Sequence, residues 1–221
     1  YATKWTDNSG TTITSVSVPS KTGYTFKGYY TAASGGTQRI TAAGALPSNT
    51  TFTSNTTLYA QWSANVYGVT LDSKYYSSSS ATSGTAATRE ASPSPVYEKY
   101  ATGWYSDSGA STSITKLSTL PEYDKYVFGG FYTGKAGSGD QVIDDSGTIK
   151  ASNNKYTSTS TVYAKYSACT CTAGTGVKSC TVSGTNTLNQ CQYSVTCNSG
   201  YSQSGGTNTT MSFTATGSAA T

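Results

Sequence analysis

The chain repeats itself at an interval of about one hundred residues. The stretch YTFKGYYT, which begins at Tyr24, returns at Tyr126 as YVFGGFYT, and TLYAQWSA from Thr57 returns at Thr161 as TVYAKYSA. The offset between matched blocks grows along the chain, which places short insertions, and therefore loops, between them. A tandem array restricts the chain to small modules with separate cores. Such arrays usually serve as spacers, as binding surfaces or as structural assemblies.

The matched blocks divide the chain into three parts. We call residues 1–64 repeat one, residues 65–168 repeat two and residues 169–221 the cysteine module. Repeat two contains an additional strand-like segment, VYGVTLD from Val66, that has no counterpart before Tyr1. We therefore expect repeat one to lack its first strand and to expose a sheet edge, which either pairs or aggregates. Either preceding residues supply the strand, or a neighbouring subunit donates it and builds a filament.

The composition favours a mostly β fold with several modest cores. Hydrophobic residues make up 35% of the 221 residues and charged residues only 11%, while Thr, Ser, Gly and 19 tyrosines are abundant. Thr and Tyr suit a half-buried pleated surface, and long helix-forming stretches are absent. Strict alternation along residues 24–31 places Phe26 and Tyr30 on one face of a strand and Tyr29 on the other.

A Ser- and Pro-rich segment, residues 77–95, interrupts repeat two. We interpret it as an exposed loop with one helical turn near residues 86–91. The alternative is a long disordered insertion.

Cysteine usage changes abruptly at the end of repeat two. All five cysteines lie in the last module, among Gly, Thr, Asn and Ser, with little apolar content to form a core. This pattern indicates a disulfide-stapled extracellular unit. A zinc site is the alternative, although the chain has no histidine and the spacing lacks paired knuckles. An odd number leaves one cysteine without a partner. The candidates for disulfides are Cys169, Cys171, Cys180, Cys191 and Cys197.

The remaining composition argues against several functions. A chain without histidine lacks the commonest general base and the usual nucleophile pairs, so we expect no enzyme activity, no catalytic residue and no cofactor. The 14 basic residues are scattered singly despite a net charge of +4, which argues against nucleic acid as a partner. No apolar stretch is long enough to span a membrane.

Two sets of side chains are candidates for ligand binding. Asp140, Asp144 and Asp145 cluster beside a Gly-rich turn, either as a solvated loop or as calcium ligands. The aromatic residues either seal the small cores or form a platform on which a sugar stacks. Tyr29 and Tyr59 are the better candidates for exposure, because alternation directs them away from the apolar faces.

The repeated blocks resemble a known family. Residues 23–31, GYTFKGYYT, and residues 57–62, TLYAQW, are similar to the signatures of the Listeria–Bacteroides repeat, the B-repeat type of bacterial internalins. The resemblance extends from Tyr1 to Ala168. It implies tandem β-grasp-like modules in surface-anchored or secreted bacterial proteins, which serve as stalks and adhesive segments. Repeat two departs from the pattern through its long loop and through Tyr166, where the family favours Trp.

We therefore expect a mostly β protein of tandem small β-grasp-like modules followed by a small disulfide-rich β module. The expected function is that of a non-enzymatic structural or adhesive protein at a bacterial surface, outside the cell. Its partners would be neighbouring repeats or subunits, or glycans and proteins of a host or cell surface. A carbohydrate-binding module and a filament subunit assembled by strand donation are the alternatives.

Overall fold

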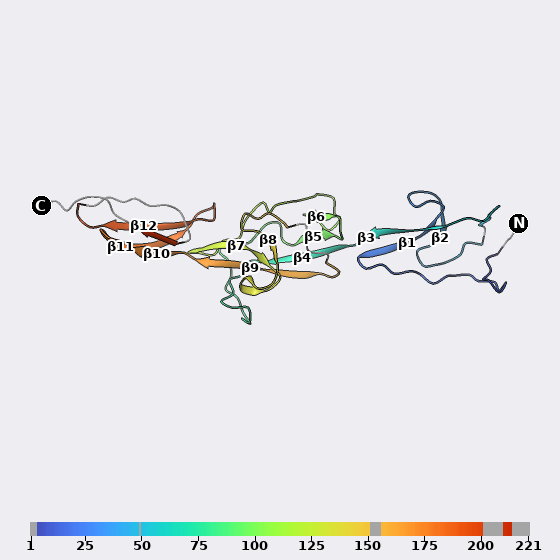
Figure 1. The fold of residues 1–221 in the computed structure, drawn as a ribbon, viewed down its shortest axis with the longest axis horizontal. Helices are drawn as coiled ribbons and strands as arrows, with labels where there is room; N and C mark the ends of the chain where they lie inside the picture. Colours follow the sequence, from blue (N-terminus) through green and yellow to red (C-terminus); the bar gives the residue numbers. More distant parts are fainter. Residues whose placement is uncertain (1–3, 49, 151–155, 201–209, 214–221) are drawn as a thin grey trace.

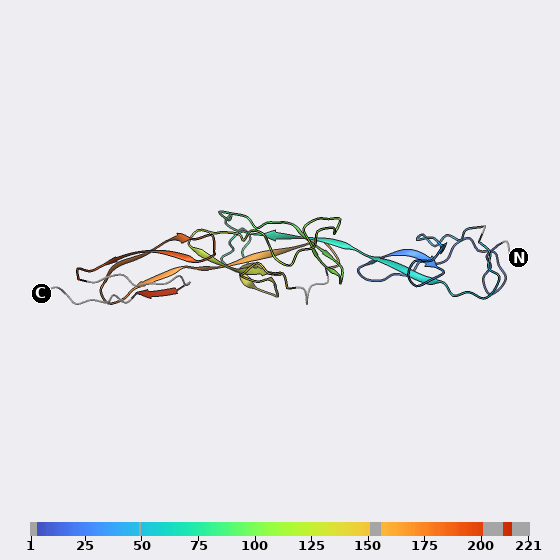
Figure 2. The same ribbon diagram turned by 90° about the horizontal axis from the view of Figure 1, so that it is seen from above.

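The computed structural model describes residues 4–48, 50–150, 156–200 and 210–213, the last group by its backbone alone. The described residues form an elongated row of modules, with repeat one and the cysteine module at opposite extremes (Figure 1), and the view from above shows the same narrow outline (Figure 2). The fold is mostly β, as the composition predicted. Within the described residues the helical content is one 3-10 turn, Lys135–Gly137.

Repeat two is built on a mixed six-stranded sheet of order β6-β5-β4-β9-β7-β8. Its two central strands, β4 and β9, run parallel, while the other neighbours pair antiparallel. A parallel central pair flanked by antiparallel strands in this order is a β-grasp arrangement. The strands are β4 (Val66–Asp72), β5 (Val96–Lys99), β6 (Gly103–Tyr105), β7 (Tyr126–Tyr132), β8 (Gln141–Ile143) and β9 (Ser160–Ala168).

The core of repeat two lies on one face of this sheet. Val69 of β4, Phe131 of β7 and Val162 of β9 are almost fully buried there, and Trp104 closes one end against Tyr156. Burying side chains of this size stabilises a fold by roughly 1.5–3 kcal/mol each. The central strand β4 therefore supplies a substantial part of the core.

Repeat one contains a shorter version of the same sheet. Its strands are β1 (Tyr24–Tyr30), β2 (Gln38–Ile40) and β3 (Tyr59–Ala64), in the order β2-β1-β3. They correspond to β7, β8 and β9. Among the described residues, no strand lies where β4 lies in repeat two.

A glycine bulge changes the side-chain pattern of β1 in repeat one and of β7 in repeat two. The pairing register of β1 with β3 shifts between Phe26 and Gly28, and that of β7 with β9 shifts between Phe128 and Phe131. An extra residue in a strand reverses the alternation beyond it. Tyr29 therefore contacts Phe26, with ring centroids 5.2 Å apart, and the strict alternation that placed it on the opposite face is wrong.

The Ser- and Pro-rich segment is an irregular loop without a helical turn. Tyr75 pairs with Thr85 across a short protruding hairpin, and Arg89 pairs with Glu122 by both backbone and side chain, their charged groups 3.1 Å apart. The expected turn at residues 86–91 is wrong because Arg89 is bridged to Glu122 and Ser92, just beyond the stretch, to Thr119, and Ala91 is buried in the core. These bridges and the buried Ala91 tie the segment to the rest of repeat two, contrary to the disordered alternative.

The cysteine module consists of extended strands. The hairpin of β11 (Val177–Thr185) and β12 (Cys191–Cys197) lies next to β10 (Thr170–Ala173), which pairs in parallel with β13 (Thr210–Phe213). Disulfides join Cys169 to Cys191 and Cys171 to Cys180. They support the disulfide prediction over the zinc alternative, because the thiolates that zinc requires are consumed. Cys197 has no disulfide partner in the described part of the chain.

Candidate functional site

The first joint between modules is a single residue within a nearly continuous strand. Strand β3 ends at Ala64 and β4 begins at Val66, so both lie along the long axis of the molecule (Figure 1). Between them, the Asn65 amide donates to the carbonyl of Gly23 at 2.9 Å, and its carbonyl accepts from the amide of Tyr100 at 2.9 Å. One residue of the joint is thus hydrogen-bonded to both repeats.

Side chains reinforce this joint from both sides. The Asn65 amide oxygen accepts from the Thr25 hydroxyl at 2.6 Å, and its NH₂ group donates to the Tyr67 hydroxyl at 3.0 Å. The Tyr100 ring of repeat two lies directly over Gly23 of repeat one, where any Cβ atom would collide with the ring. Tyr100 also packs edge-on against Tyr24, with centroids 5.4 Å apart.

The second joint repeats this construction with different residues. Strand β9 ends at Ala168 and β10 begins at Thr170, and the amide of the intervening Cys169 donates to the Lys125 carbonyl at 2.8 Å. Cys169 and Lys125 occupy the positions of Asn65 and Gly23. Two chemically different sequences therefore make the same backbone connection.

The turn of the cysteine hairpin folds back onto repeat two. The Asn189 side chain accepts from the Phe128 amide at 2.6 Å and donates to the Phe128 carbonyl at 2.8 Å, as a neighbouring strand would. Cys191, fully buried just beyond this turn, is bonded to Cys169 at the joint. The disulfide thus attaches the hairpin to the joint, and the two hydrogen bonds of Asn189 attach it to repeat two.

A cleft of about 640 Å³ lies where this hairpin meets repeat two. Arg89, Lys116 and Asp145 contribute mixed charges to its walls, and Leu188, 74% exposed, stands at the hairpin turn. Among the described residues its lining contains no aromatic side chain, which makes it unlike a sugar-stacking site.

In the described residues, β3 is the last strand of the sheet of repeat one, whereas its counterpart β9 has a further neighbour, β4. In repeat two, β4 pairs with β9 over Ser160–Tyr163, whose counterparts are residues 56–59. Strand β9 begins at Ser160, whereas β3 begins only at Tyr59. The described strand in repeat one is therefore shorter at the residues whose counterparts pair with β4 in repeat two.

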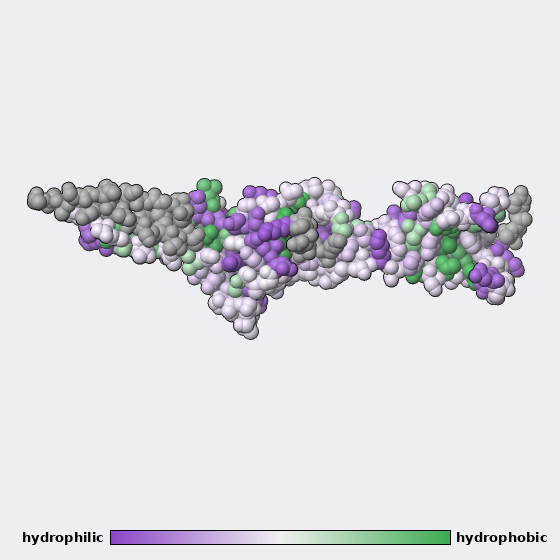
Figure 3. All heavy atoms as spheres, viewed as in Figure 1, coloured by the Kyte–Doolittle hydropathy of each residue, from purple (hydrophilic) through white to green (hydrophobic). Residues whose placement is uncertain are grey.

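The apolar residues beside this edge are less buried than their counterparts. Val162 and Tyr166 are 1% and 9% exposed in repeat two, whereas Leu58 and Trp62 are only partly buried. Figure 3 shows apolar surface on repeat one. The first strand and the loop that cover the core of repeat two have no described counterpart here.

The acidic cluster contains a hydrogen-bonded turn at Asp144. The Asp144 carboxylate accepts hydrogen bonds from the Ser146 hydroxyl and from the Ser146 and Thr148 amides, all within 2.9 Å. Burial opposes ionisation, but these bonds outweigh it and lower the pKa of Asp144. Asp140, Asp144 and Asp145 form no metal-sized group in the described part of the chain, which argues against the calcium alternative. Asp7 makes the same turn in repeat one.

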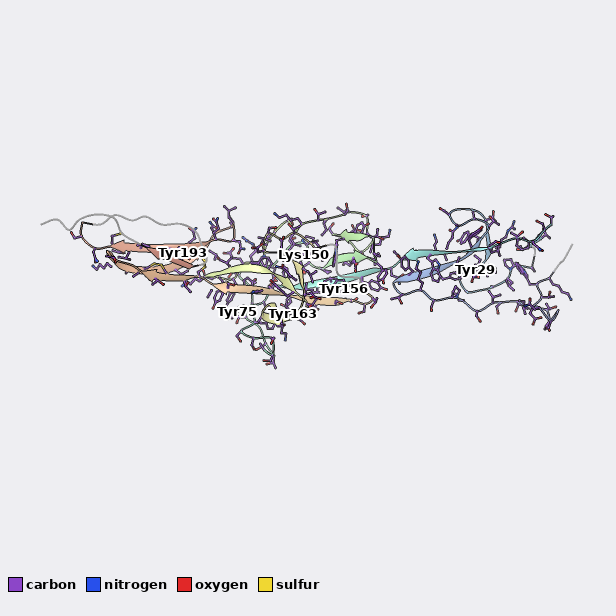
Figure 4. The ribbon with its side chains drawn as sticks, in the orientation of Figure 1. Tyr29, Tyr75, Lys150, Tyr156, Tyr163 and Tyr193 are labelled. Carbon is purple, nitrogen blue, oxygen red and sulfur yellow. A yellow bond between two sulfur atoms is a disulfide. The ribbon has the colours of Figure 1, made fainter. Side chains whose placement is uncertain are left out.

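The two tyrosines proposed as ligand contacts differ in exposure. Tyr59 is 43% exposed, whereas Tyr29 is half-buried against Phe26 within repeat one (Figure 4). The counterpart of Tyr29 is Phe131, which is fully buried. Tyr29 therefore belongs to the core side of its strand.

Sequence reasoning missed the residues that form the joints. Asn65 falls between the matched blocks and Asn189 lies in the unmatched module, so neither carried a signal. Tyr100 was visible as the first residue of a repeated block, but its place over Gly23 depends on how the modules meet. In the described residues, no helix is long and apolar enough to cross a membrane.

Comparison with known proteins finds a family match within repeat one. Residues 2–61 match the model of the Listeria-Bacteroides repeat domain. The match stops short of repeat two, to which the sequence resemblance also extended. No solved structure significantly matches the chain. The resemblance is thereby confirmed for repeat one, whose residues 2–61 match a repeat domain family that is typical of bacterial surface proteins.

Proposed function

We propose that the chain is a non-enzymatic structural segment of a bacterial surface protein, a stiff spacer that acts outside the cell. The observation that carries this proposal is the strand continuity across both joints, from β3 into β4 and from β9 into β10. A flexible linker would instead allow each module to turn freely. The disulfides favour an oxidising extracellular compartment, and the lack of histidine argues against most catalytic sites.

The sheet of repeat two is suited to carrying tension. The chain enters at the start of β4 and leaves at the end of β9, and these strands pair in parallel. Tension along the molecule therefore pulls the two strands past each other and loads the hydrogen bonds between them together. This geometry supports a role in which the chain holds an adhesive part away from the cell.

Force spectroscopy tests the spacer proposal. The oxidised chain is pulled first through its ends and then through cysteine-free attachment tags at residues 79 and 109, which lie in loops of repeat two. We expect a higher unfolding force in the end-to-end geometry, since only that geometry shears β4 against β9. Equal forces in both geometries, together with a compact solution-scattering profile, would contradict a load-bearing spacer.

Carbohydrate binding is the second candidate, and the exposed ring of Tyr59 favours it. Tyr59 lies opposite Tyr30 of the neighbouring strand, so two aromatic residues are adjacent. A glycan array compares the unmodified chain with Tyr59→Ala, with Tyr193→Ala in the cysteine module as the control. Binding that disappears only in Tyr59→Ala supports this candidate, and binding that no variant alters argues against it.

A further inference from the structure

Three tyrosine rings meet at the end of repeat two that is nearest the second joint. Tyr75 follows β4 in the chain, Tyr123 precedes β7 and Tyr126 begins it. Tyr75 stacks on Tyr123 with ring centroids 4.9 Å apart, and it meets Tyr126 at 5.0 Å with the ring planes inclined by 45°. Tyr126 lies opposite Ala168, the last residue of β9, and Figure 4 shows Tyr75 toward the same end of the sheet.

The phenol groups of Tyr75 and Tyr126 approach each other at the surface. All three rings of the cluster are only partly buried, so solvent reaches them. Burial, together with the charge and hydrogen bonding of the Tyr75 hydroxyl, raises the pKa of Tyr126. Because the two hydroxyl groups are neighbours, the ring carbons ortho to them are neighbours as well.

The geometry of the third ring differs. Tyr123 lies face to face with Tyr75, with ring planes within 9° of each other. A carbon–carbon bond between two phenols joins the rings edge to edge. The inclined pair of Tyr75 and Tyr126 therefore needs less rotation to form such a bond than the stacked pair does.

The charges around the cluster also distinguish it from other tyrosines. The Lys21 ammonium lies 4.2 Å from the ring centroid of Tyr24, and the Lys135 ammonium lies 4.7 Å from that of Tyr76. Among the described residues, no cation lies over any ring of the cluster. A positive charge beside a ring opposes the loss of an electron from it, so the cluster is easier to oxidise than Tyr24 or Tyr76.

We propose that Tyr75 and Tyr126 form a dityrosine cross-linking site, at which a one-electron oxidant of the haem peroxidase class, acting with hydrogen peroxide, joins the two rings covalently. Each phenol gives up one electron and one proton, and the peroxide takes up both pairs and becomes two waters. The two phenoxyl radicals couple at carbons ortho to their oxygens. The protons on those carbons then move to the oxygens and restore both phenols, so the product is two hydrogen atoms lighter.

The bond would close a loop of about 50 residues within repeat two. When repeat two unfolds under tension, the chain inside this loop would stay out of the extension. The unfolding length should therefore fall by about 170 Å. The site does not depend on the spacer function, which rests on the joints and on the pairing of β4 with β9.

Peptide mapping of the oxidised full chain tests the site. Cys197 is alkylated first, so that its free thiol does not consume radicals, and the folded chain is treated with a haem peroxidase and limiting hydrogen peroxide. Trypsin then places Tyr75, Tyr123 and Tyr126 on three different peptides, which are residues 75–89, 117–125 and 126–135. The matched variants are Tyr126→Phe and Tyr123→Phe, because phenylalanine keeps the ring but forms no phenoxyl radical.

We expect mass spectrometry of the monomeric product to show peptides 75–89 and 126–135 joined, with the loss of two hydrogen atoms. The joined pair should be lost in Tyr126→Phe and retained in Tyr123→Phe. Equal yields from the folded chain and from a chain oxidised in denaturant would overturn the proposal, as would a pair that persists in Tyr126→Phe or fails to form at all. A product that joins 75–89 to 117–125 instead would overturn the choice of Tyr126.

Discussion

At the scale of single residues, two glycines fix the bulges that shape both sheets. Gly28 and Gly130 have φ values of 126° and 110°, a backbone conformation that other residues rarely adopt. A Cβ atom on either would also collide with the carbonyl oxygen of Ile40 or Ile143. The recurrence of this glycine in both blocks therefore reflects a steric requirement.

Gly130→Ala should destabilise repeat two by about 2 kcal/mol or more, from backbone strain and the collision with Ile143. Denaturant unfolding followed by Trp104 fluorescence measures the loss. Gly129→Ala is the matched control, because a Cβ atom there meets only Lys165, at ordinary contact distances from 3.5 Å. Equal losses in the two variants would contradict the steric explanation.

A buried tyrosine should make stability depend on alkaline pH. The Tyr166 hydroxyl donates to the Ser73 carbonyl at 2.7 Å, and burial, assisted by nearby carboxylates, raises its pKa above the ordinary value. Burial, with the charge of Glu98, also raises the pKa of Tyr156 to about 12. Because the folded state holds these protons more tightly, this stabilisation is present below about pH 10 and is lost as pH rises through the folded pKa values.

Tyr166→Phe should reduce the loss of stability between about pH 9 and 12, because one raised pKa is removed. At neutral pH it should cost about 1 kcal/mol, since the Ser73 carbonyl loses its partner. Thermal unfolding across this pH range measures both effects, with Tyr59→Phe as the exposed control. An unchanged alkaline profile in Tyr166→Phe would show that other groups cause the loss.

At the scale of elements, the disulfides have distinct structural roles. Cys169–Cys191 links the second joint to the turn end of the hairpin, whereas Cys171–Cys180 closes a shorter loop within the module. The first bond also holds the turn near Phe128, where Asn189 makes its two hydrogen bonds.

Replacing Cys169 and Cys191 together by Ser should destabilise the hairpin by about 2–4 kcal/mol. It should also release Asn189 from repeat two, seen as faster exchange of the Phe128 amide. The pair Cys171→Ser and Cys180→Ser should leave that amide protected. Thiol titration of the unsubstituted, unreduced protein in denaturant should give one free thiol. A count of three or more would contradict the pairing.

At the scale of the whole molecule, the rod depends on joints that are only one residue long. The Tyr100 ring closes the first joint by covering Gly23 and packing against Tyr24. The backbone hydrogen bonds of Asn65 alone would leave a narrow hinge between the two repeats. The Tyr100 ring therefore provides the resistance to bending at this joint.

Tyr100→Ala should therefore make repeat one turn relative to repeat two without unfolding either. We expect small-angle scattering to give a shorter mean end-to-end dimension than in the native chain, while circular dichroism stays unchanged. Tyr59→Ala, which removes an exposed ring away from the joint, should retain the native dimension. If both variants retain it, the backbone connection alone holds the rod straight.

The sequence alone determined the periodic and local features of this protein. The repeated blocks predicted two related modules, because each module buries the same aromatic pattern, and the uneven cysteines indicated disulfides. The strand blocks that begin at Tyr24 and Tyr126 could be recognised from their residues. The Asp144 turn could not be separated from a calcium site, since the same oxygens serve either purpose.

The tertiary structure alone decided where side chains face and how the modules meet. Alternation misplaced Tyr29, because a bulge at Gly28 depends on its pairing with β3 and not on local propensity. The sequence could not predict that Asn65, Tyr100 and Asn189 stabilise the joints, because their partners lie far away in the sequence. The additional segment of repeat two could be read from the repeated blocks, but only the structure shows that it pairs with β9 and that the described β3 is shorter than β9.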